Sequence, residues 1–122
     1  MKTIIDANVI LRYLLDDDKD MADMAEKIIM NGAKTLPEVL AEVVYVLSGV
    51  YKMQRSEVSE CLFAIIDIVD IDNKEVMNRA IEIYNSKNLD FVDCILIANN
   101  HVKGEDVFSF DKKLNRELIK LD

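Results

Sequence analysis

The stretch KTIIDANVILRYLL at residues 2–15 decides the fold. Its first four residues are rich in β-branched side chains and end abruptly at Asp6, which indicates a buried strand that leads into a helix. The apolar residues that follow predict that this helix runs from Val9 to about Leu15. The chain therefore opens with a strand and a helix that are joined at an acidic residue.

The same alternation continues along the chain. Strands are expected at AKTL, IVDI and DVFSF, residues 33–36, 68–71 and 106–110. Pro37 suits the first position of a strongly apolar helix, and Ser56 can cap the next helix. Strands that alternate with helices indicate an α/β fold, a three-layer α/β/α arrangement around a small parallel central sheet of about four or five strands. Further helices are expected at about 21–30, 74–86, 90–102 and 111–121.

Length and composition favour one domain over residues 1–122, because 51% of the 122 residues are hydrophobic. The formal net charge of −8 means that the molecule as a whole repels nucleic acid unless cations or a local basic patch intervene. No apolar run approaches the ~20 residues that a membrane span requires. Cys61 and Cys94 form no CxxC pair. We therefore expect reduced core thiols in a soluble, cytoplasmic protein.

Acidic side chains stand where an open parallel sheet gathers its ligands, just beyond the carboxyl ends of the strands. Asp6 and Asp111 each directly follow an expected strand, and both also suit the N-cap of the next helix. Asp90 and Asp93 have the spacing of a capping box, with Asp in place of the usual Glu, and a carboxylate at Asp93 can also project toward a ligand. Taken singly, each of these acids has an ordinary structural explanation.

Glu42 is harder to explain, because it stands in the middle of a helix that is apolar on nearly every side. No lysine or arginine lies three or four residues away, and Glu38 carries a like charge. A carboxylate at this position needs a partner elsewhere in the fold or a metal, unless it lies on a narrow exposed stripe of the helix. Both interpretations stay open on the sequence alone.

As a set, the carboxylates predict a divalent cation. The winding of the sheet can bring Asp6, Asp93 and Asp111 together, and carboxylates that share a site repel and raise one another's pKa. A hard cation removes that cost, and all-oxygen ligation selects Mg²⁺ or Mn²⁺ over zinc. Such a cation can activate a water and neutralise the charge that develops on a phosphodiester. Phosphoester hydrolysis is therefore the expected reaction.

Four segments, IIDANVILRYLL, PEVLAEVVYVL, LDFVDCILIANN and FSFDKKL, occur in this order over essentially the whole chain. They resemble the PIN-domain family, and most closely the VapC-type toxins of prokaryotic toxin–antitoxin pairs. The resemblance implies a PIN-like fold and a Mg²⁺- or Mn²⁺-dependent endoribonuclease that cleaves RNA with an activated water. It identifies the catalytic acids and metal ligands as Asp6, Glu42, Asp93 and Asp111, with Asn8 and Ser109 as supporting polar residues and Asp90 as a further supporting candidate.

The resemblance also implies partners. RNA is the substrate, the active form is commonly a homodimer, and a cognate antitoxin protein covers the site with its tail and can insert a basic side chain among the acids. Because the chain is acidic overall, local cations have to hold the RNA. The expected phosphate contacts are Arg12, Lys112, Lys113 and Arg116.

A candidate dimer face lies on two neighbouring helices, which carry more apolar surface than one small core needs. It consists of Tyr45, Val46, Tyr51 and Met53 with the apolar residues of 61–66. A monomer in sedimentation at micromolar concentration would exclude this face.

Two other classes of protein are alternatives. A phosphorylation-dependent receiver domain has a similar length, architecture and acidic pocket, but it needs paired acids at the end of the first strand, where this chain has Asp6 and Asn8. Its phosphoacceptor would end the third strand, and Asp72 follows that strand without the remaining pattern. The second alternative is a PIN-like module that acts through protein or RNA contacts only, with a weak or idle metal site.

Overall fold

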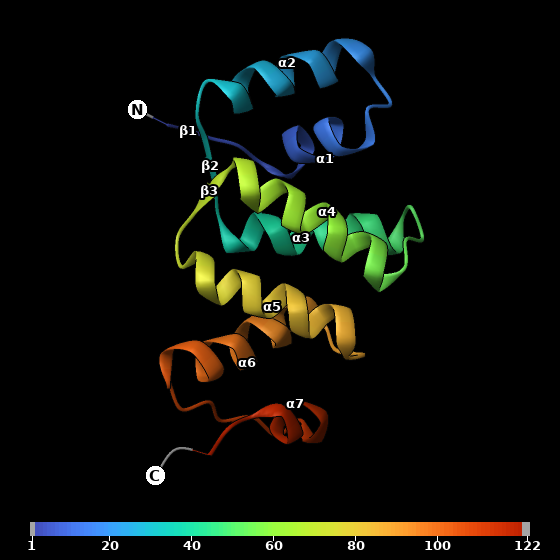
Figure 1. Cartoon of the computed structure of the whole chain (residues 1–122). Helices are drawn as coiled ribbons and strands as arrows, with labels where there is room; N and C mark the ends of the chain where they lie inside the picture. Colours follow the sequence, from blue (N-terminus) through green and yellow to red (C-terminus); the bar gives the residue numbers. More distant parts are fainter. Residues whose placement is uncertain (1, 121–122) are drawn as a thin grey trace. The chain divides into compact units, whose positions relative to one another are not determined.

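The computed structural model describes residues 2–120 and divides the chain into two compact units, Met1–Asp72 and Asn73–Asp122. The family resemblance predicts that the two units together form one domain. The elements are labelled in Figure 1. The first unit contains β1 (Thr3–Ile4), α1 (Ala7–Leu15), α2 (Lys19–Met30), β2 (Ala33–Thr35), α3 (Pro37–Gly49), α4 (Arg55–Ile68) and β3 (Asp70–Ile71), and the second contains α5 (Lys74–Ser86), α6 (Phe91–Lys103) and α7 (Lys112–Glu117).

The sheet of the first unit consists of three short parallel strands in the order β1-β2-β3. Thr3 is the register partner of Ala33. Thr35 is fully buried, and its hydroxyl donates to the carbonyl of Ile5 at 3.2 Å. This bond ties the end of β2 to the residue before Asp6. The predicted α/β class and parallel pairing are confirmed, and Asp6 lies just beyond the carboxyl end of β1.

Two ion pairs link neighbouring strands at the surface of the sheet. Lys2 pairs with Asp70, and the Lys34 ammonium lies 3.3 Å from a carboxylate oxygen of Asp72. All four side chains are substantially exposed, so each pair contributes about 0–1 kcal/mol. Asp72, the acid that follows β3, is therefore already partnered by a lysine.

The helices of the first unit bury one continuous apolar core. In this unit α1 packs on α2 and α3, and α3 packs on α4 (Figure 1). The helix predicted from Pro37 begins there, because the proline ring is suited to a first helical position. Burial of each large side chain stabilises the fold by about 1.5–3 kcal/mol. The fully buried side chains in these helices include Ile10, Leu40, Val43, Leu47, Leu62 and Ile65.

The start of α4 differs from the sequence prediction. Gln54, not Ser56, is the N-cap, and it forms a capping box with Glu57. The backbone N–H of Gln54 donates to the Glu57 carboxylate at 3.3 Å. Ser56 therefore lies inside the helix, and the prediction that it caps this helix was wrong because a reciprocal pair one turn apart satisfies two helix-end donors where a single hydroxyl satisfies one.

In the second unit, α5 packs along α6, and α7 follows after a loop (Figure 1). The rings of Tyr84 and Phe91 meet edge to face with centroids 5.8 Å apart. Asn100 is buried on α6, and its amide donates to the carbonyls of Glu105 and Ile119 at 3.0 and 3.1 Å. The N–H of Ile119 returns a hydrogen bond to the Asn100 oxygen at 2.7 Å. One buried amide thus holds both ends of the segment that carries α7.

His101 adds a second connection between α6 and α7. Its Nδ1 accepts a hydrogen bond from Arg79 on α5 at 3.1 Å, and its Nε2 lies 2.6 Å from the carbonyl oxygen of Glu117. With Nδ1 as the acceptor, Nε2 is placed to donate to the Glu117 carbonyl. The position of α7 on α6 therefore depends on polar side chains as well as on buried Leu114.

The strand predicted at 106–110 does not form, and residues 2–120 contain a sheet of three strands where four or five were expected. Local hydrogen bonds take the place of a ladder in this segment. The N–H of Asp111 donates to the Ser109 hydroxyl at 2.9 Å, and the Asn115 amide donates to the Ser109 carbonyl at 2.8 Å. The exposed rings of Phe108 and Phe110 meet edge to face, with centroids 5.1 Å apart. The alternating pattern was misleading because neither aromatic ring enters a core.

Two helix boundaries also depart from expectation. Ile68 was assigned to a strand and instead ends α4, and the helix expected over 111–121 stops at Glu117. The chain leaves α7 there because Ile119 bonds to Asn100 instead of continuing the helical pattern. The remainder of that prediction, beyond residue 120, lies outside the described residues.

Cys61 and Cys94 are free thiols, Cys94 buried and Cys61 half-buried, as expected. Burial, and then the charges of Glu60 and Glu57, raises the pKa of Cys61 above its ordinary value. Within residues 2–120 no helix has both the length and the apolar character needed to cross a membrane.

Candidate active site

Asp6 is both exposed and bound to its helix. It is the N-cap of α1, and its Oδ1 accepts the backbone N–H of Val9 at 3.1 Å, which confirms the cap interpretation. No hydrogen bond of the described residues uses Oδ2 of this carboxylate. The cap and a metal ligand are therefore compatible roles, because each oxygen of one carboxylate can serve a different partner.

Glu42 projects from the exposed side of α3. Leu40, Val43 and Val44 around it are buried, whereas Glu38 one turn earlier is exposed. The interpretation of a narrow exposed stripe is thus confirmed for this residue. None of the ion pairs found in residues 2–120 includes Glu42, so its charge faces solvent without a cationic partner.

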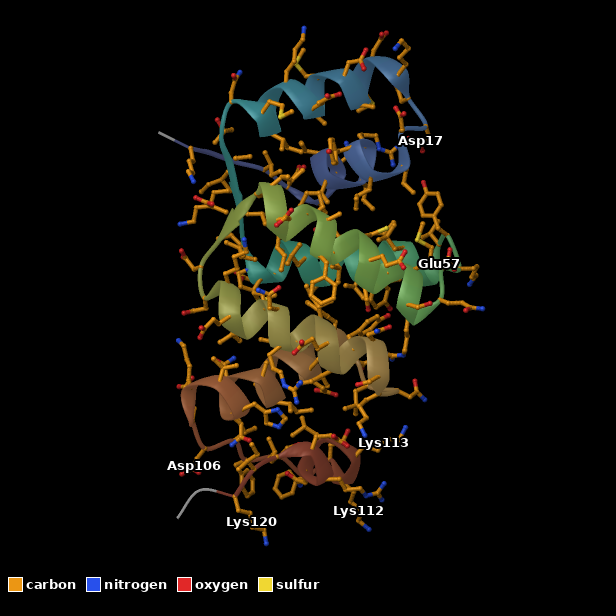
Figure 2. The ribbon with its side chains drawn as sticks, in the orientation of Figure 1. Asp17, Glu57, Asp106, Lys112, Lys113 and Lys120 are labelled. Carbon is orange, nitrogen blue, oxygen red and sulfur yellow. The ribbon has the colours of Figure 1, made fainter. Side chains whose placement is uncertain are left out.

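Asn8 and Arg12 accompany Asp6 on α1. Asn8 is an exposed helical residue, and no described hydrogen bond joins it to Asp6. Arg12 is turned toward Asp17, with its Nη1 2.8 and 3.0 Å from the two carboxylate oxygens. A hydrogen bond with Tyr51, and to a lesser degree Asp17, raises the pKa of Arg12. The charge of Arg12 is therefore partly neutralised inside the first unit, near the point where Figure 2 labels Asp17.

Three carboxylates influence one another in the second unit. Asp93 is half-buried in the first turn of α6. Burial, followed by the negative charges of Asp90 and Asp111, raises the pKa of Asp93 above its ordinary value. The three acids come from two separate segments, one at the start of α6 and one at the start of α7. The fold of this unit thus concentrates negative charge around Asp93.

Asp90 does not cap α6 as predicted. It occupies the N-cap position, but its side chain makes no cap hydrogen bond within the described part of the chain. The capping-box interpretation of Asp90 and Asp93 was wrong because two carboxylates in one turn repel each other, whereas a capping box with Glu pairs it with a neutral cap. The Asp90 carboxylate remains available to a cation.

Asp111 is an exposed N-cap whose two oxygens have different surroundings. Its Oδ1 accepts the N–H groups of Lys113 and Leu114 at 2.8 and 3.2 Å. The Ser109 hydroxyl accepts the N–H of Asp111 itself, so Ser109 fixes the backbone beside the acid. No hydrogen bond described for residues 2–120 uses Oδ2 of Asp111. This oxygen is free for a ligand.

Comparison with known proteins identifies the fold family. The family model of the PIN domain matches residues 3–117. The chain belongs to the PIN domain family. A VapC ribonuclease of Aquifex aeolicus (strain VF5) is 24% identical over 121 aligned residues, which cover 93% of this chain and 90% of that relative. The resemblance drawn from the sequence is therefore confirmed, and the matched range of the PIN domain contains every acid named for the site.

The acids of this PIN domain suit a hard cation by their chemistry. Among residues 2–120 no three Asp, Glu, His or Cys side chains stand close enough to hold a metal together. The carboxylates around Asp93 interact through their charges without meeting, as repelling groups do. A divalent cation would reverse the sign of that interaction, and the free oxygens of Asp6 and Asp111 are of the type that Mg²⁺ and Mn²⁺ bind.

Sequence reasoning missed the polar side chains that position the acids of this PIN domain. Asn100 and His101 hold α7, and with it Asp111, against α6, which carries Asp93. Their signal in the sequence was the run of polar residues 99–101 in an otherwise apolar helix. A buried amide of this kind is placed by backbone partners far along the chain, so its role was not legible from spacing.

Proposed function

We propose that this PIN domain protein is a Mg²⁺- or Mn²⁺-dependent endoribonuclease, the toxin of a type II toxin–antitoxin pair. Membership of the PIN domain family and the likeness to a VapC ribonuclease support the proposal. Within the structure, the strongest support is the gathering of acids in the second unit, where burial and then the charges of Asp90 and Asp111 raise the pKa of Asp93. No observation on the chain favours a receiver domain.

We assign the metal to Asp6, Glu42, Asp93 and Asp111, with Asn8, Ser109 and Asp90 in support. These residues bind and orient the reacting groups. Oδ1 of Asp111 is fixed by two helix N–H groups, so its free Oδ2 has a defined direction. Ser109 prevents the loop from turning away. Glu42 and Asp6 are exposed, so a phosphodiester can reach them.

When bound, the cation supplies the Lewis acid that activates a water and neutralises charge on the phosphodiester. The carboxylates of the chain would hold the cation and accept hydrogen bonds from the attacking water. Partial burial of Asp93 keeps bulk solvent from screening this interaction.

Removal of the metal is expected to stop RNA cleavage. Protein stripped with EDTA is assayed on a mixed RNA pool, alone and with added Mg²⁺ or Mn²⁺, and fragments are expected only with metal. Asp6→Asn is the matched site variant, because Asn caps a helix as well as Asp does while it removes the charge. We expect it to keep the helical content of the wild type and to lose cleavage.

The same assay separates the proposal from the alternative of an idle PIN-like module. A wild type that binds Mn²⁺ in calorimetry but leaves every RNA intact would favour the idle module. Cleavage that persists in EDTA would contradict the metal dependence. Cleavage by Asp6→Asn at the wild-type rate would contradict the assignment of this acid.

The partners that we propose are RNA, a cognate antitoxin protein and a second copy of the chain. The likeness to a VapC ribonuclease supports RNA as the substrate, and the exposed acids offer a surface on which a basic antitoxin side chain would bind. Of the expected phosphate contacts, Lys112, Lys113 and Arg116 are exposed on α7, whereas Arg12 is paired with Asp17.

Replacement of Tyr45 by glutamate is expected to convert a homodimer into a monomer. Tyr45 is 80% exposed on α3, and Phe63 on α4 is also exposed, whereas Leu62, Ile65 and Ile66 from the predicted face lie in the core. A charge at the centre of an apolar interface is costly. Sedimentation velocity at micromolar concentration measures the effect, with Glu57→Gln at the start of α4, labelled in Figure 2, as a control on the same unit. A monomeric wild type would exclude the proposed dimer.

A further inference from the structure

A small basic pocket lies in the second unit between α7 and the segment that follows α5. Its volume is about 160 Å³, and its lining contains two lysines and an arginine against one carboxylate. Lys113, Arg116 and Glu117 are spaced so that they lie on one face of α7. The residues that line it are Lys87, Asn88, Leu89, Lys113, Arg116 and Glu117.

The three cationic side chains of the pocket differ in whether they pair with a carboxylate. The ammonium of Lys87 lies 3.8 Å from a carboxylate oxygen of Glu117, so these two residues largely offset each other. Lys113 and Arg116 have no carboxylate within 4.0 Å in the part of the chain that the structure describes. Two cations therefore face a cavity without a counter-ion, in a chain whose net charge is −8.

Both segments that line the pocket also carry an acid of the candidate active site. Leu89 directly precedes Asp90, and Lys113 donates its backbone N–H to Asp111 at 2.8 Å. Asp90 and Asp111 both belong to the set of acids proposed above for the metal. Lys112 does not line the pocket, and Figure 2 shows its label and that of Lys113 on opposite sides of α7.

We propose that this pocket binds one phosphate of single-stranded RNA, next to the phosphate that is cleaved. The inference rests on the proposed ribonuclease function. The guanidinium of Arg116 offers paired donors to phosphate oxygens, and the ammonium of Lys113 adds a point charge on the same group. Because the acids repel RNA, a neighbouring phosphate held in the pocket fixes the register of the strand at the site.

The test measures binding in EDTA, where no cleavage occurs, and uses a fluorescein-labelled uridine dodecamer as the probe. The dissociation constant of the full chain is determined by anisotropy from 50 to 200 mM salt. Lys113→Ala and Arg116→Ala are each expected to weaken binding, while the cation that remains keeps most of the slope of log K against log salt. The double variant is expected to reduce this slope by about 0.7, the value for one phosphate of a single strand, because both side chains hold the same phosphate.

Matched variants separate the pocket from a general loss of positive charge. Lys120→Ala removes an exposed lysine just beyond α7 that does not line the pocket, and we expect the wild-type slope. Figure 2 labels this residue. Arg116→Lys keeps the charge and is expected to recover the slope but only part of the affinity, since a lysine lacks the paired donors. Glu117→Gln removes the carboxylate of the pocket and is expected to tighten binding by about two- to fivefold.

The inference is overturned if the double variant keeps the wild-type slope and affinity, or if the wild type does not bind the probe. A double variant whose slope falls by about 1.4 indicates two separate phosphate contacts and also contradicts a single pocket. A double variant that still binds RNA but no longer binds a polyglutamate peptide would mean that the pocket binds carboxylates instead of phosphate. RNA cleavage by the wild type is scored separately, so failure of the pocket is distinguished from failure of the ribonuclease proposal.

Discussion

Replacement of Asp93 by asparagine is expected to abolish metal-dependent RNA cleavage and, at the same time, to make the metal-free protein more stable. Loss of a metal ligand removes several kcal/mol of transition-state stabilisation, so the rate is expected to fall about a thousandfold or more. The asparagine keeps the shape of the side chain but carries no charge. It therefore removes both the burial of a charge and the repulsion by Asp90 and Asp111, which together raise the pKa of the wild-type acid.

The stability gain has a defined pH dependence. Because the pKa of Asp93 is raised in the folded state, folding favours its protonated form. The metal-free wild type therefore loses stability as the pH rises from the ordinary pKa of an aspartate through the raised folded-state value, and the asparagine variant does not share that loss. Melting temperatures in EDTA at pH 3 and pH 7 are expected to be similar for the two proteins at the lower pH and higher for the variant at the upper pH.

Added Mn²⁺ is expected to reverse this order. A cation that binds only the folded state raises the melting temperature of the wild type, whereas the variant gains little. Asp106→Asn is the matched control, since it removes an exposed aspartate of the same unit that does not act on Asp93 (Figure 2). The role given to Asp93 would be contradicted if Asp93→Asn melts below the wild type in EDTA at pH 7, or if it still cleaves RNA with Mn²⁺.

Replacement of Asn100 by aspartate is expected to destabilise the fold by about 3–5 kcal/mol, a large part of the stability of a small domain. The amide nitrogen donates to the carbonyls of Glu105 and Ile119, and a carboxylate would place a negative oxygen against both of them. The side chain is 3% exposed, so water cannot take over either bond. Urea unfolding followed by circular dichroism measures the change.

Asn99→Asp is the control for Asn100→Asp. The two residues are neighbours on α6, but Asn99 is half-buried and donates only to Ile95 in its own helix, at 2.9 Å. We expect a loss of about 1 kcal/mol. Equal effects of the two variants would mean that Asn100 does not hold the segment of α7. Weaker destabilisation of Asn100→Asp at pH 4 would support the charge as the cause, because a protonated carboxyl can donate one hydrogen bond.

The fold was predictable wherever one local pattern decided an element. Pro37 started α3, and Asp6 and Asp111 capped α1 and α7 as expected. The prediction failed at residues 106–110, where alternating apolar residues resembled a strand. A strand needs a neighbour with free backbone groups, and Ser109 instead bonds to Asn115. An alternating pattern shows which residues are apolar, but it does not show whether a neighbouring strand is available for pairing.

The acids of the candidate site stay a prediction as a set, and the sequence misjudged the local surroundings of several of them. The sequence allowed Glu42 to be either a buried charge or part of an exposed stripe, and in the structure its side chain is exposed. Asp90 matched the spacing of a capping box, but spacing takes no account of the charge on Asp93. Arg12 stood close to Asp6 in the sequence, yet its conformation is set by Asp17 and Tyr51. The partners of a long flexible side chain cannot be predicted from its position in the sequence alone.

With the proposed cation in place, the divided use of the Asp6 and Asp111 carboxylates would make the backbone amides bonded to them sensitive to metal binding. One oxygen of each is bonded to a backbone amide, of Val9 in the first case and of Lys113 and Leu114 in the second. A cation on the other oxygen would draw charge from the shared carboxylate and hold it in place. Exchange of these three amide hydrogens with deuterium would then slow as the metal binds, so the first turns of α1 and α7 would register an event that takes place outside the helices.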